Sequence, residues 1–485
     1  MTTPEQPPVI ETSLPNEPEK KVDWGFWVWL GCSVLLMLVV TVVATAAVVR
    51  YAIQNGNFLS ANQREFIVKL ATPHRELRSL HRTIDAFVSQ KPMSLLLDRF
   101  PLEEEHWINK FPEESDKGYL LLSGVDPIYK QSIVSLIRVS DGERIKTWVP
   151  NWPYINSKLS NKIALIAKEQ ISKVNDFDLL ATHPLLLKNG ELIFKTSEGG
   201  GLIKIGLCNS EPEWVLDGFY HHSNEIDTEG NIWSPSNMQI KDWPTDNKYF
   251  ATSVSNDSIS KVSNDGRVLN EISFVKVLID NNLQALLFGA FGDTFNFDPL
   301  HINQITPAMQ VSPHWNVGDL LISARNISTV FLYRPSTNKI IWYKQGPWLN
   351  QHAAAFINDH EISIFSNNVI SGASDENSFL NSSDDNKVIV YDFRNKTITE
   401  PFKTLLEIDK PRTVGEGLGQ ILPDGGLFVE DTRHGRQLRY SKNKLLWSRI
   451  NYYDEKYIGA LSWSRYLTDK QSAKPISSIL AAKCK

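Results

Sequence analysis

The sequence predicts an all-β protein, a six-bladed β-propeller preceded by one N-terminal transmembrane helix and a helical stalk. Three observations support this prediction. A strand–turn–strand phrase recurs through the C-terminal part of the chain, its closest copies start 39 residues apart at His183 and His222, and a long uncharged run lies near the N-terminus. A repeat of about 40 residues with four short strands is typical of a propeller blade.

The N-terminal part divides into a tail and an apolar segment. Residues 1–23 are polar and proline-rich, which is typical of a disordered tail. Residues 24–50 form the predicted transmembrane anchor, because no charged side chain occurs from Trp24 to Val49 and about 20 apolar residues span a bilayer as a helix. Trp24, Trp27 and Trp29 fit an interfacial aromatic belt.

The flanking charges favour one orientation of this segment. Lys20 and Lys21 precede it and Arg50 follows it directly, a small excess of positive charge that is compatible with a cytoplasmic tail. We therefore expect the C-terminal domain to be extracytoplasmic, periplasmic or extracellular. The alternative is a cleavable signal peptide, because Ala44-Thr45-Ala46 resembles a cleavage site. The run is longer than a usual signal core, which favours an anchor. No other long apolar run follows, so we expect a single-pass membrane protein.

Residues 51–117 are predicted to form a helical stalk or linker. Apolar residues recur at helical spacings among charged ones, and Pro92 and Pro101 interrupt the pattern. These apolar residues are Phe66, Leu70, Leu77, Leu80, Ile84 and Phe87. At the other end of the chain, residues 467–485 are predicted to be a C-terminal tail.

Residues 118–466 carry the predicted propeller. Copies of the phrase start at His183, His222, His301 and His352, and a further copy has Gly419 in the position of the histidine. Residues 118–150 supply part of a sixth blade. The lead residue opens the innermost strand of its blade, and innermost strands line the central channel, so the four histidines should approach one channel mouth. A pair of β-sandwiches is the alternative. It is less favoured because the strands of a sandwich need not follow a recurring sequence pattern.

Composition excludes several classes of function. The net charge of −5 and the lack of a basic stripe argue against a nucleic-acid partner. Cys32, Cys208 and Cys484 show neither a disulfide framework nor zinc spacing. A histidine cluster could bind a metal, but no carboxylate pattern supports one, so we expect neither metal nor cofactor. The chain has no phosphate-binding Gly-rich loop for a nucleotide donor and no Gly-x-Ser-x-Gly elbow.

Three segments together resemble the bacterial arylsulfotransferases, which use an aryl sulfate donor instead of a nucleotide sulfate. They are Asp298-Pro-Leu-His301-Ile-Asn303, Gly318-Asp-Leu-Leu-Ile-Ser-Ala-Arg325 and Gln351-His352-Ala. The resemblance covers roughly residues 180–450 and is most specific from 298 to 352. It implies a six-bladed propeller with its active site in the channel, where a histidine takes the sulfuryl group and passes it to a phenol.

The resemblance also implies roles for individual residues. His352 matches the histidine that is sulfated, while His301 and Arg325 match residues that hold the sulfuryl oxygens. Asn303 matches a polar neighbour that binds the substrate, and His222 matches a further channel histidine. His221 is the alternative to His222, and His183 has no functional counterpart, which favours a structural role.

The chemistry of these residue types agrees with the implied reaction. A neutral imidazole is a competent nucleophile near pH 7, because its unperturbed pKa is about 6.5. An arginine can neutralise sulfuryl oxygens, and a second histidine can protonate the departing phenolate. Aryl sulfates and phenols are therefore the expected partners. The alternative function is a catalytically silent, membrane-anchored propeller that serves as an extracytoplasmic binding or scaffold module.

Overall fold

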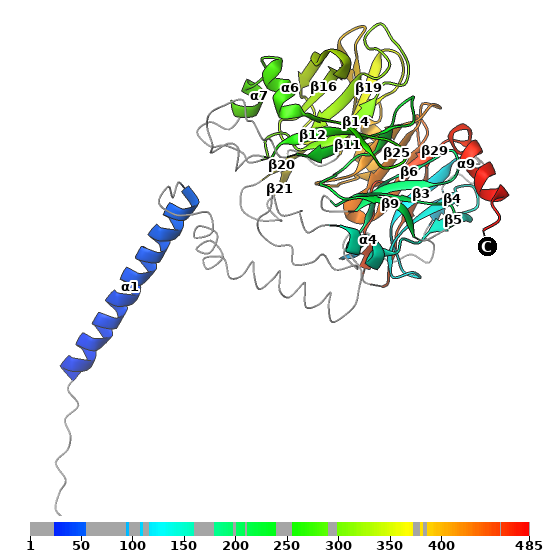
Figure 1. Cartoon of the computed structure of the whole chain (residues 1–485). Coiled ribbons are helices and arrows are strands. Elements are labelled where there is room, and N and C mark those ends of the chain that lie inside the picture. The colour runs from blue at the N-terminus through cyan, green and yellow to red at the C-terminus, as the bar shows by residue number, and fades with distance from the viewer. Residues whose placement is uncertain are drawn as a thin grey trace, which may run out of the picture. The chain divides into compact units, whose positions relative to one another are not determined.

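The computed structural model describes residues 24–54, 94–96, 107–109, 116–159, 179–196, 200–208, 211–238, 255–289, 298–371, 379–381, 386–455 and 457–484. The chain separates into two compact units, Met1–Ser89 and Gln90–Lys485. The first unit contains the helix α1 (Trp24–Gln54), drawn in blue in Figure 1. The second contains all the strands (Figure 1).

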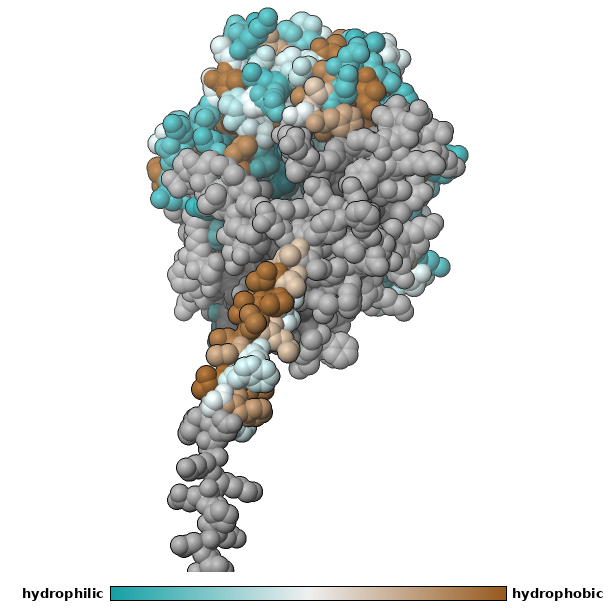
Figure 2. Space-filling model, turned by 90° about the vertical axis from the view of Figure 1, so that its left-hand side faces the viewer, coloured by the Kyte–Doolittle hydropathy of each residue, from teal (hydrophilic) through white to brown (hydrophobic). Residues whose placement is uncertain are grey.

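Helix α1 carries a stretch, Gly25–Ala47, that is long and apolar enough to cross a membrane. Its apolar side chains are exposed and form the brown surface of the helix in Figure 2. The hydroxyls of Thr41 and Thr45 donate to the carbonyls four residues earlier, at 2.8 and 2.7 Å, so the helix satisfies its own polar side chains. An apolar helix near the N-terminus is equally the form of a signal sequence.

The second unit is a six-bladed β-propeller, which confirms the predicted fold. Each blade is an antiparallel sheet whose first-named strand is innermost. The first blade consists of β29 (Arg465–Leu467), β3 (Tyr119–Asp126), β4 (Gln131–Arg138) and β5 (Arg144–Trp148). The second consists of β6 (Ala181–Leu186), β7 (Leu192–Thr196), β8 (Leu202–Ile205) and β9 (Pro212–Leu216). The third consists of β10 (Glu225–Ile226), β11 (Ile232–Asn237), β12 (Asp257–Val262) and β13 (Val268–Ser273).

The other three blades follow in chain order. The fourth consists of β14 (Ile302–Pro307), β15 (Leu320–Ala324), β16 (Thr329–Arg334) and β17 (Lys339–Gln345). The fifth consists of β18 (Gln351–Phe356), β19 (Glu361–Ser366), β22 (Lys387–Asp392) and β23 (Thr397–Thr399). The sixth consists of β24 (Leu418–Ile421), β25 (Leu427–Asp431), β26 (Arg436–Tyr440) and β27 (Leu445–Ile450). A hairpin of β20 (Val369–Ser371) and β21 (Phe379–Asn381) is inserted in the fifth blade.

The ring is closed by the two ends of the propeller sequence. The C-terminal strand β29 supplies the innermost strand of the first blade, with Arg465 opposite Leu121 and Leu467 opposite Tyr119. This explains why the predicted sixth blade was incomplete when read from residues 118–150 alone. Hydrogen bonds between distant parts of the sequence therefore hold the first and last blades together.

The hydrophobic core lies between the blades. Six clusters of buried side chains each join two neighbouring blades, as where Trp152 and Phe194 pack edge to face between the first and second. Because every blade is covered on both faces, its middle strands read as continuous buried runs, such as β7. Short helices lie between strands or blades, namely α4 (Trp152–Lys158), α6 (Phe274–Asp280), α7 (Ala285–Phe288) and α8 (Lys403–Asp409).

Two short strands occur where the sequence predicts a helical stalk. Strand β2 (Trp107–Asn109) pairs with β27 as a fifth strand of the last blade, and β1 (Ser94–Leu96) pairs with β28 (Tyr457–Gly459). The helical prediction is wrong for Ser94–Leu96, whose backbone pairs with a strand instead, and Trp107–Asn109 covers the open edge of the last blade. Residues 55–93, 97–106 and 110–115 of the predicted stalk or linker, and residues 1–23, lie outside the described residues.

The predicted C-terminal tail is largely a helix, α9 (Asp469–Ala481). Thr468 and Gln471 begin it with a capping box, and Ser478 donates to the carbonyl of Lys188 in the second blade. A disulfide joins Cys208 to Cys484, which corrects the expectation that the cysteines form no such bond. The two cysteines are 276 residues apart in sequence, and only the closed ring brings them together.

Candidate active site at the channel mouth

Three of the lead histidines adopt a left-handed backbone. His183, His222 and His301 have φ values of 48°, 59° and 52°, and Trp463 has 55° just before the innermost strand of the closing blade. Such a conformation costs about 1–2 kcal/mol for a residue with a Cβ atom. Strain of this kind persists where the surroundings enforce it, often at functional sites. Asn350 and Glu416, with φ values of 49° and 60°, hold the corresponding place before β18 and β24, so a left-handed residue occurs near the start of the innermost strand in all six blades.

The predicted channel histidines lie together. The ring of His222 is central, with its centroid 4.9 Å from that of His301 and 5.9 Å from that of His352. His221 is 5.1 Å from His222, and Trp463 is 5.7 Å from it. We call His221, His222, His301, His352 and Arg325 the histidine cluster.

His183 occupies a separate position beside this cluster. Its ring stacks on Trp463 with a centroid distance of 4.3 Å and is buried. The indole of Trp463 lies between His183 and the rings of His222 and His352, at 5.7 and 6.3 Å from them. Its N–H donates to the carbonyl of Gly417 at 3.0 Å, which fixes the indole in place. This arrangement agrees with a structural role for His183.

The hydrogen bonds around His352 determine its tautomer. Nδ1 lies 2.5 Å from Oδ1 of Asn367. The amide nitrogen of Asn367 donates to the carbonyls of Thr413 and Glu416, at 3.0 and 2.9 Å. Because these two acceptors orient the amide, its oxygen must face the imidazole, so Nδ1 carries the proton. The lone pair of His352 is therefore on Nε2.

The other side of His352 agrees with this assignment. The backbone N–H of Glu416 donates to Nε2 at 3.1 Å, a bond that requires a lone pair there. Burial lowers the pKa of His352 well below its usual value, and the positive charge of Arg325 lowers it further. The imidazole is thus held neutral, with Nε2 as its acceptor atom. The bond from Glu416 must open before Nε2 can form a bond to a substrate.

Arg325 and His301 form the charged side of the cluster. Nδ1 of His301 lies 2.6 Å from Oδ2 of Asp298, and the backbone N–H of Arg325 donates to the carbonyl of His301 at 3.1 Å. Burial raises the pKa of Asp298, but the hydrogen bond and charge of His301 outweigh it, so the net pKa is lowered. Asp298 is therefore a carboxylate at neutral pH.

The Arg325 side chain has a buried N–H that finds no acceptor among the described residues. Nη1 donates to the side chain of Asn326 at 3.0 Å, whereas the buried Nε finds no hydrogen-bond acceptor among the described residues. A buried N–H of a charged group without a partner costs free energy, about 1–3 kcal/mol or more. An anion bound beside Arg325 would supply the missing acceptor.

His221 and His222 contact each other directly. Their Nδ1 atoms lie 2.9 Å apart, so one of them donates and the other accepts. Burial lowers the pKa of both, that of His221 to about 3, and the neighbouring His301 adds to the effect. Nζ of the buried Lys195 donates to the carbonyls of His222 and Ser223 and holds this turn. The pair is therefore neutral at pH 7.

Asn303 lies outside the histidine cluster proper. Its side chain is buried, and Nδ2 donates to the carbonyl of Gln351 at 2.9 Å. The bond ties β14 to β18 at the residue immediately before His352. In this structure Asn303 thus positions the strand that carries His352.

Sequence reasoning missed three residues of this site. Asp298 was visible as the first residue of the Asp298-Pro-Leu-His301 motif, three positions before the histidine that it contacts. Trp463 holds the lead position of a blade that spans both chain ends, so its copy of the phrase is not recognisable. Asn367 lies at the end of a strand of the fifth blade, and the sequence carries no signal for it.

Carboxylates and histidines with the spacing of metal ligands occur elsewhere. Among the residues that the structure describes, the one such group consists of His360, Glu361 and Asp392, at the outer turns of the fifth blade. His360 there lies against Asp359 and Arg394, at 2.5 and 2.6 Å. None of these residues belongs to the histidine cluster.

Comparison with known proteins connects the site with one family. The family model described as Arylsulfotransferase (ASST) matches residues 184–452, a range that contains every residue of the histidine cluster and Asn367 and ends before Trp463. No curated protein matches the sequence.

Solved structures with a similar course of the chain are distant in sequence. A protein of unknown function from Bacteroides caccae is 12% identical, with a TM-score of 0.42, covering 73% of this chain and 99% of that one. The Pan2 WD40 domain of Neurospora crassa is 10% identical, with a TM-score of 0.33 and coverages of 73% and 98%. A virginiamycin B lyase from Staphylococcus aureus is 13% identical, with a TM-score of 0.30 and coverages of 56% and 70%.

Proposed function

This chain belongs to the arylsulfotransferase family, and we propose that it moves a sulfuryl group from an aryl sulfate ester to a phenol through a sulfohistidine at His352. One observation carries the proposal. A buried, neutral imidazole has its lone pair fixed on Nε2, beside an arginine whose buried N–H has no acceptor. A nucleophile and an anion-binding donor are the two groups that sulfuryl transfer needs.

The reaction has two steps with a balanced exchange of bonds. In the first, Nε2 of His352 forms a bond to sulfur while the bond from sulfur to the aryl oxygen breaks, and the departing phenolate takes a proton. In the second, the oxygen of the acceptor phenol bonds to sulfur as the nitrogen–sulfur bond breaks, and the phenol loses its proton. The free imidazole is restored after each cycle.

The charged side of the cluster would stabilise both steps. Among the described residues, none accepts a hydrogen bond from Nε of Arg325, so this donor is free for a sulfuryl oxygen. Nδ1 of His301 faces the Asp298 carboxylate, so Nε2 is the ring atom left to exchange a proton with the leaving phenolate or the acceptor phenol. His222 lies between His301 and His352 and completes the wall of the site.

The transfer itself is the first test. The purified full chain in lipid nanodiscs, given 4-nitrophenyl sulfate and 1-naphthol, should release nitrophenolate and form naphthyl sulfate in equal amounts. Initial rates should give parallel lines in double-reciprocal plots, because the donor product leaves before the acceptor reacts. If no sulfate transfer occurs with any of a panel of phenols, the catalytically silent propeller becomes the better account.

The disulfide indicates where the propeller is located. A bond between Cys208 and Cys484 persists in an oxidising compartment, and disulfides are rare in the reducing cytosol. Together with the apolar helix α1, this supports a single-pass protein whose propeller is extracytoplasmic.

This location predicts the redox state of the two cysteines in the cell. When membranes are isolated with an alkylating agent present, Cys208 and Cys484 should be unmodified until a reductant is added. Cys32, which forms no disulfide, should react once the protein is denatured, with or without the reductant. Alkylation of Cys484 without a reductant would argue for a reducing compartment.

A further inference from the structure

A large cavity occupies the channel beyond the histidine cluster. It has a volume of about 970 Å³, and the innermost strands of all six blades contribute to its lining. It begins at His183 and Trp463 and ends at the exposed turn residues Asn358, Pro423 and Lys442. We call this space the channel cavity. Small-molecule sites in proteins usually measure about 300–1,000 Å³.

Two layers separate the channel cavity from His352. The first is the stacked pair of His183 and Trp463, which contacts both spaces. The second crosses the channel, since Arg465 donates to Glu225 at 3.0 Å and the amide of Gln304 donates to the same carboxylate at 3.2 Å. No residue of the histidine cluster lines the cavity, so the two spaces are distinct.

The charges of the channel cavity cancel. Its lining contains two carboxylates, Glu225 and Glu361, and two cationic side chains, Arg465 and Lys442. Deep in the channel, Arg465 is paired with Glu225, and Lys442 is exposed at the outer end. Burial keeps His183 neutral by lowering its pKa. In the deep part of the cavity, an anion such as an aryl sulfate would lose its hydration beside an arginine that is already paired with Glu225, and Lys442 lies only at the exposed outer end. The deep part therefore favours an uncharged ligand.

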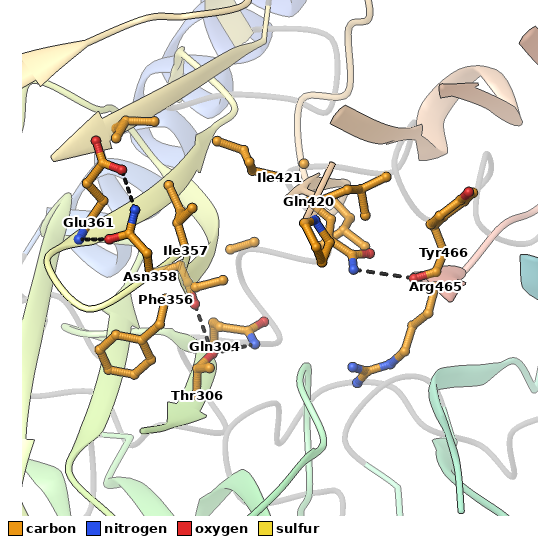
Figure 3. A pocket seen from close by; sticks show the side chains of 18 of the residues that line it. Gln304, Thr306, Phe356, Ile357, Asn358, Glu361, Gln420, Ile421, Arg465 and Tyr466 are labelled. Atoms are coloured by element: carbon orange, nitrogen blue, oxygen red, sulfur yellow. Dashed lines mark hydrogen bonds between the residues drawn. The ribbon is translucent and has the colours of Figure 1, made fainter. Parts of the chain in front are cut away.

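Two amides of the lining present acceptor atoms. Nε2 of Gln304 donates to Glu225 and to the hydroxyl of Thr306, and Nε2 of Gln420 donates to the carbonyl of Tyr466. In both side chains the hydrogen bonds to described residues use the nitrogen, which leaves the carbonyl oxygens as acceptors. Figure 3 shows Gln304 and Gln420 on opposite sides of the open space. A ligand between them would therefore carry hydrogen-bond donors.

The rest of the wall is apolar and partly aromatic. Ala353, Ala354, Phe356, Ile421 and Trp463 line it, and Phe356 and Ile421 can be followed in Figure 3. Small side chains on β18 beside aromatic rings favour a flat aromatic body, because rings stack on rings at little cost in conformational entropy.

We propose that the channel cavity binds an uncharged aromatic molecule with hydroxyl or amide donors at both ends, at a site separate from that of sulfuryl transfer. The site goes beyond the proposed function and does not depend on it. Such a ligand places donors on the two glutamine oxygens and its ring against Phe356 and Trp463.

Titration calorimetry of the full chain in lipid nanodiscs, with dihydroxynaphthalene as the probe, tests the proposal. We expect saturable binding that includes one site per chain that is retained in His352→Ala. Dimethoxynaphthalene, which has no donors, should bind at least about tenfold more weakly, since a hydrogen bond contributes on the order of 1–1.5 kcal/mol. Naphthalene disulfonate should not bind at this site. Absence of probe binding, or equal binding of the disulfonate, would overturn the proposal.

Variants locate the bound probe. Ala355→Phe fills the cavity from β18 and should abolish binding, while Gln420→Met removes one acceptor and should weaken it about tenfold. Gln345→Met, the same change on the outer strand β17, and His352→Ala should leave affinity unchanged. Binding that survives Gln420→Met and disappears in His352→Ala would assign the probe to the histidine cluster instead. If Ala355→Phe does not fold, the other three variants decide the question.

Discussion

Replacing His352 by alanine should lower the rate of sulfuryl transfer by at least about 10⁴-fold, because the variant has no nucleophile to carry the group. No other histidine of the cluster combines a lone pair on a defined nitrogen with a backbone N–H that orients it. Direct transfer from donor to acceptor would require both molecules to fit beside Arg325 at once. Initial rates of naphthyl sulfate formation measure the loss.

The covalent intermediate gives this prediction a second measurement. With the aryl sulfate alone, the wild-type chain should gain the mass of one SO₃ group on the peptide that contains His352, and nitrophenolate should appear as a burst of one equivalent. His183→Ala is the matched control, because it also removes a buried, neutral histidine beside Trp463. The control should keep activity within about tenfold. Labelling of the His352→Ala chain would assign the nucleophile to another residue.

The propeller and the convergence of its histidines could be predicted from the sequence because both are properties of a repeat. A strand that stands at the same position of each sequence repeat occupies the same place in every blade, and its first residue reaches the channel. The left-handed backbone of His183, His222 and His301 is the local form of that shared position. His352 differs, since the left-handed residue of its blade is Asn350, two positions earlier.

Contacts that the repeat does not specify could not be predicted. Asn367 contacts His352 from the end of another strand of the same blade, and Thr413 and Glu416 orient it from the following connection. Trp463 contacts the cluster because β29 returns to the first blade. The Cys208–Cys484 bond depends on the same closure. The contacts of Trp463 and of Cys484 join residues that become neighbours only when the ring closes, whereas Asn367 reaches His352 through the pairing of β18 with β19 inside one blade. The pattern of the repeat predicts neither kind of contact.

Replacing Asn367 by aspartate should make the rate of transfer fall as the pH is lowered, whereas the rate of the wild type should stay nearly constant from pH 7 to 6. In the wild type, burial and Arg325 hold the pKa of His352 well below 6.5, so Nε2 stays unprotonated as the pH falls from 7 to 6. A carboxylate 2.5 Å from Nδ1 would stabilise the imidazolium and raise that pKa, by about 1–3 units for a close opposite charge. The acid limb of the rate profile should therefore move to higher pH, and activity should recover as the pH rises above 8.

Asn386→Asp separates positioning of His352 from support of the fold. Asn386 belongs to the same buried network, since its amide donates to the carbonyls of Asn367 and Thr413, but it does not contact His352. Both variants lose buried hydrogen bonds and should be destabilised to a similar degree, about 1–3 kcal/mol for each lost partner. Only Asn367→Asp places a charge against the imidazole, so only that variant should shift the acid limb. Identical pH profiles for the two variants would mean that Asn367 supports only the fold. A shift confined to Asn367→Asp would identify Asn367 as the group that holds the His352 tautomer.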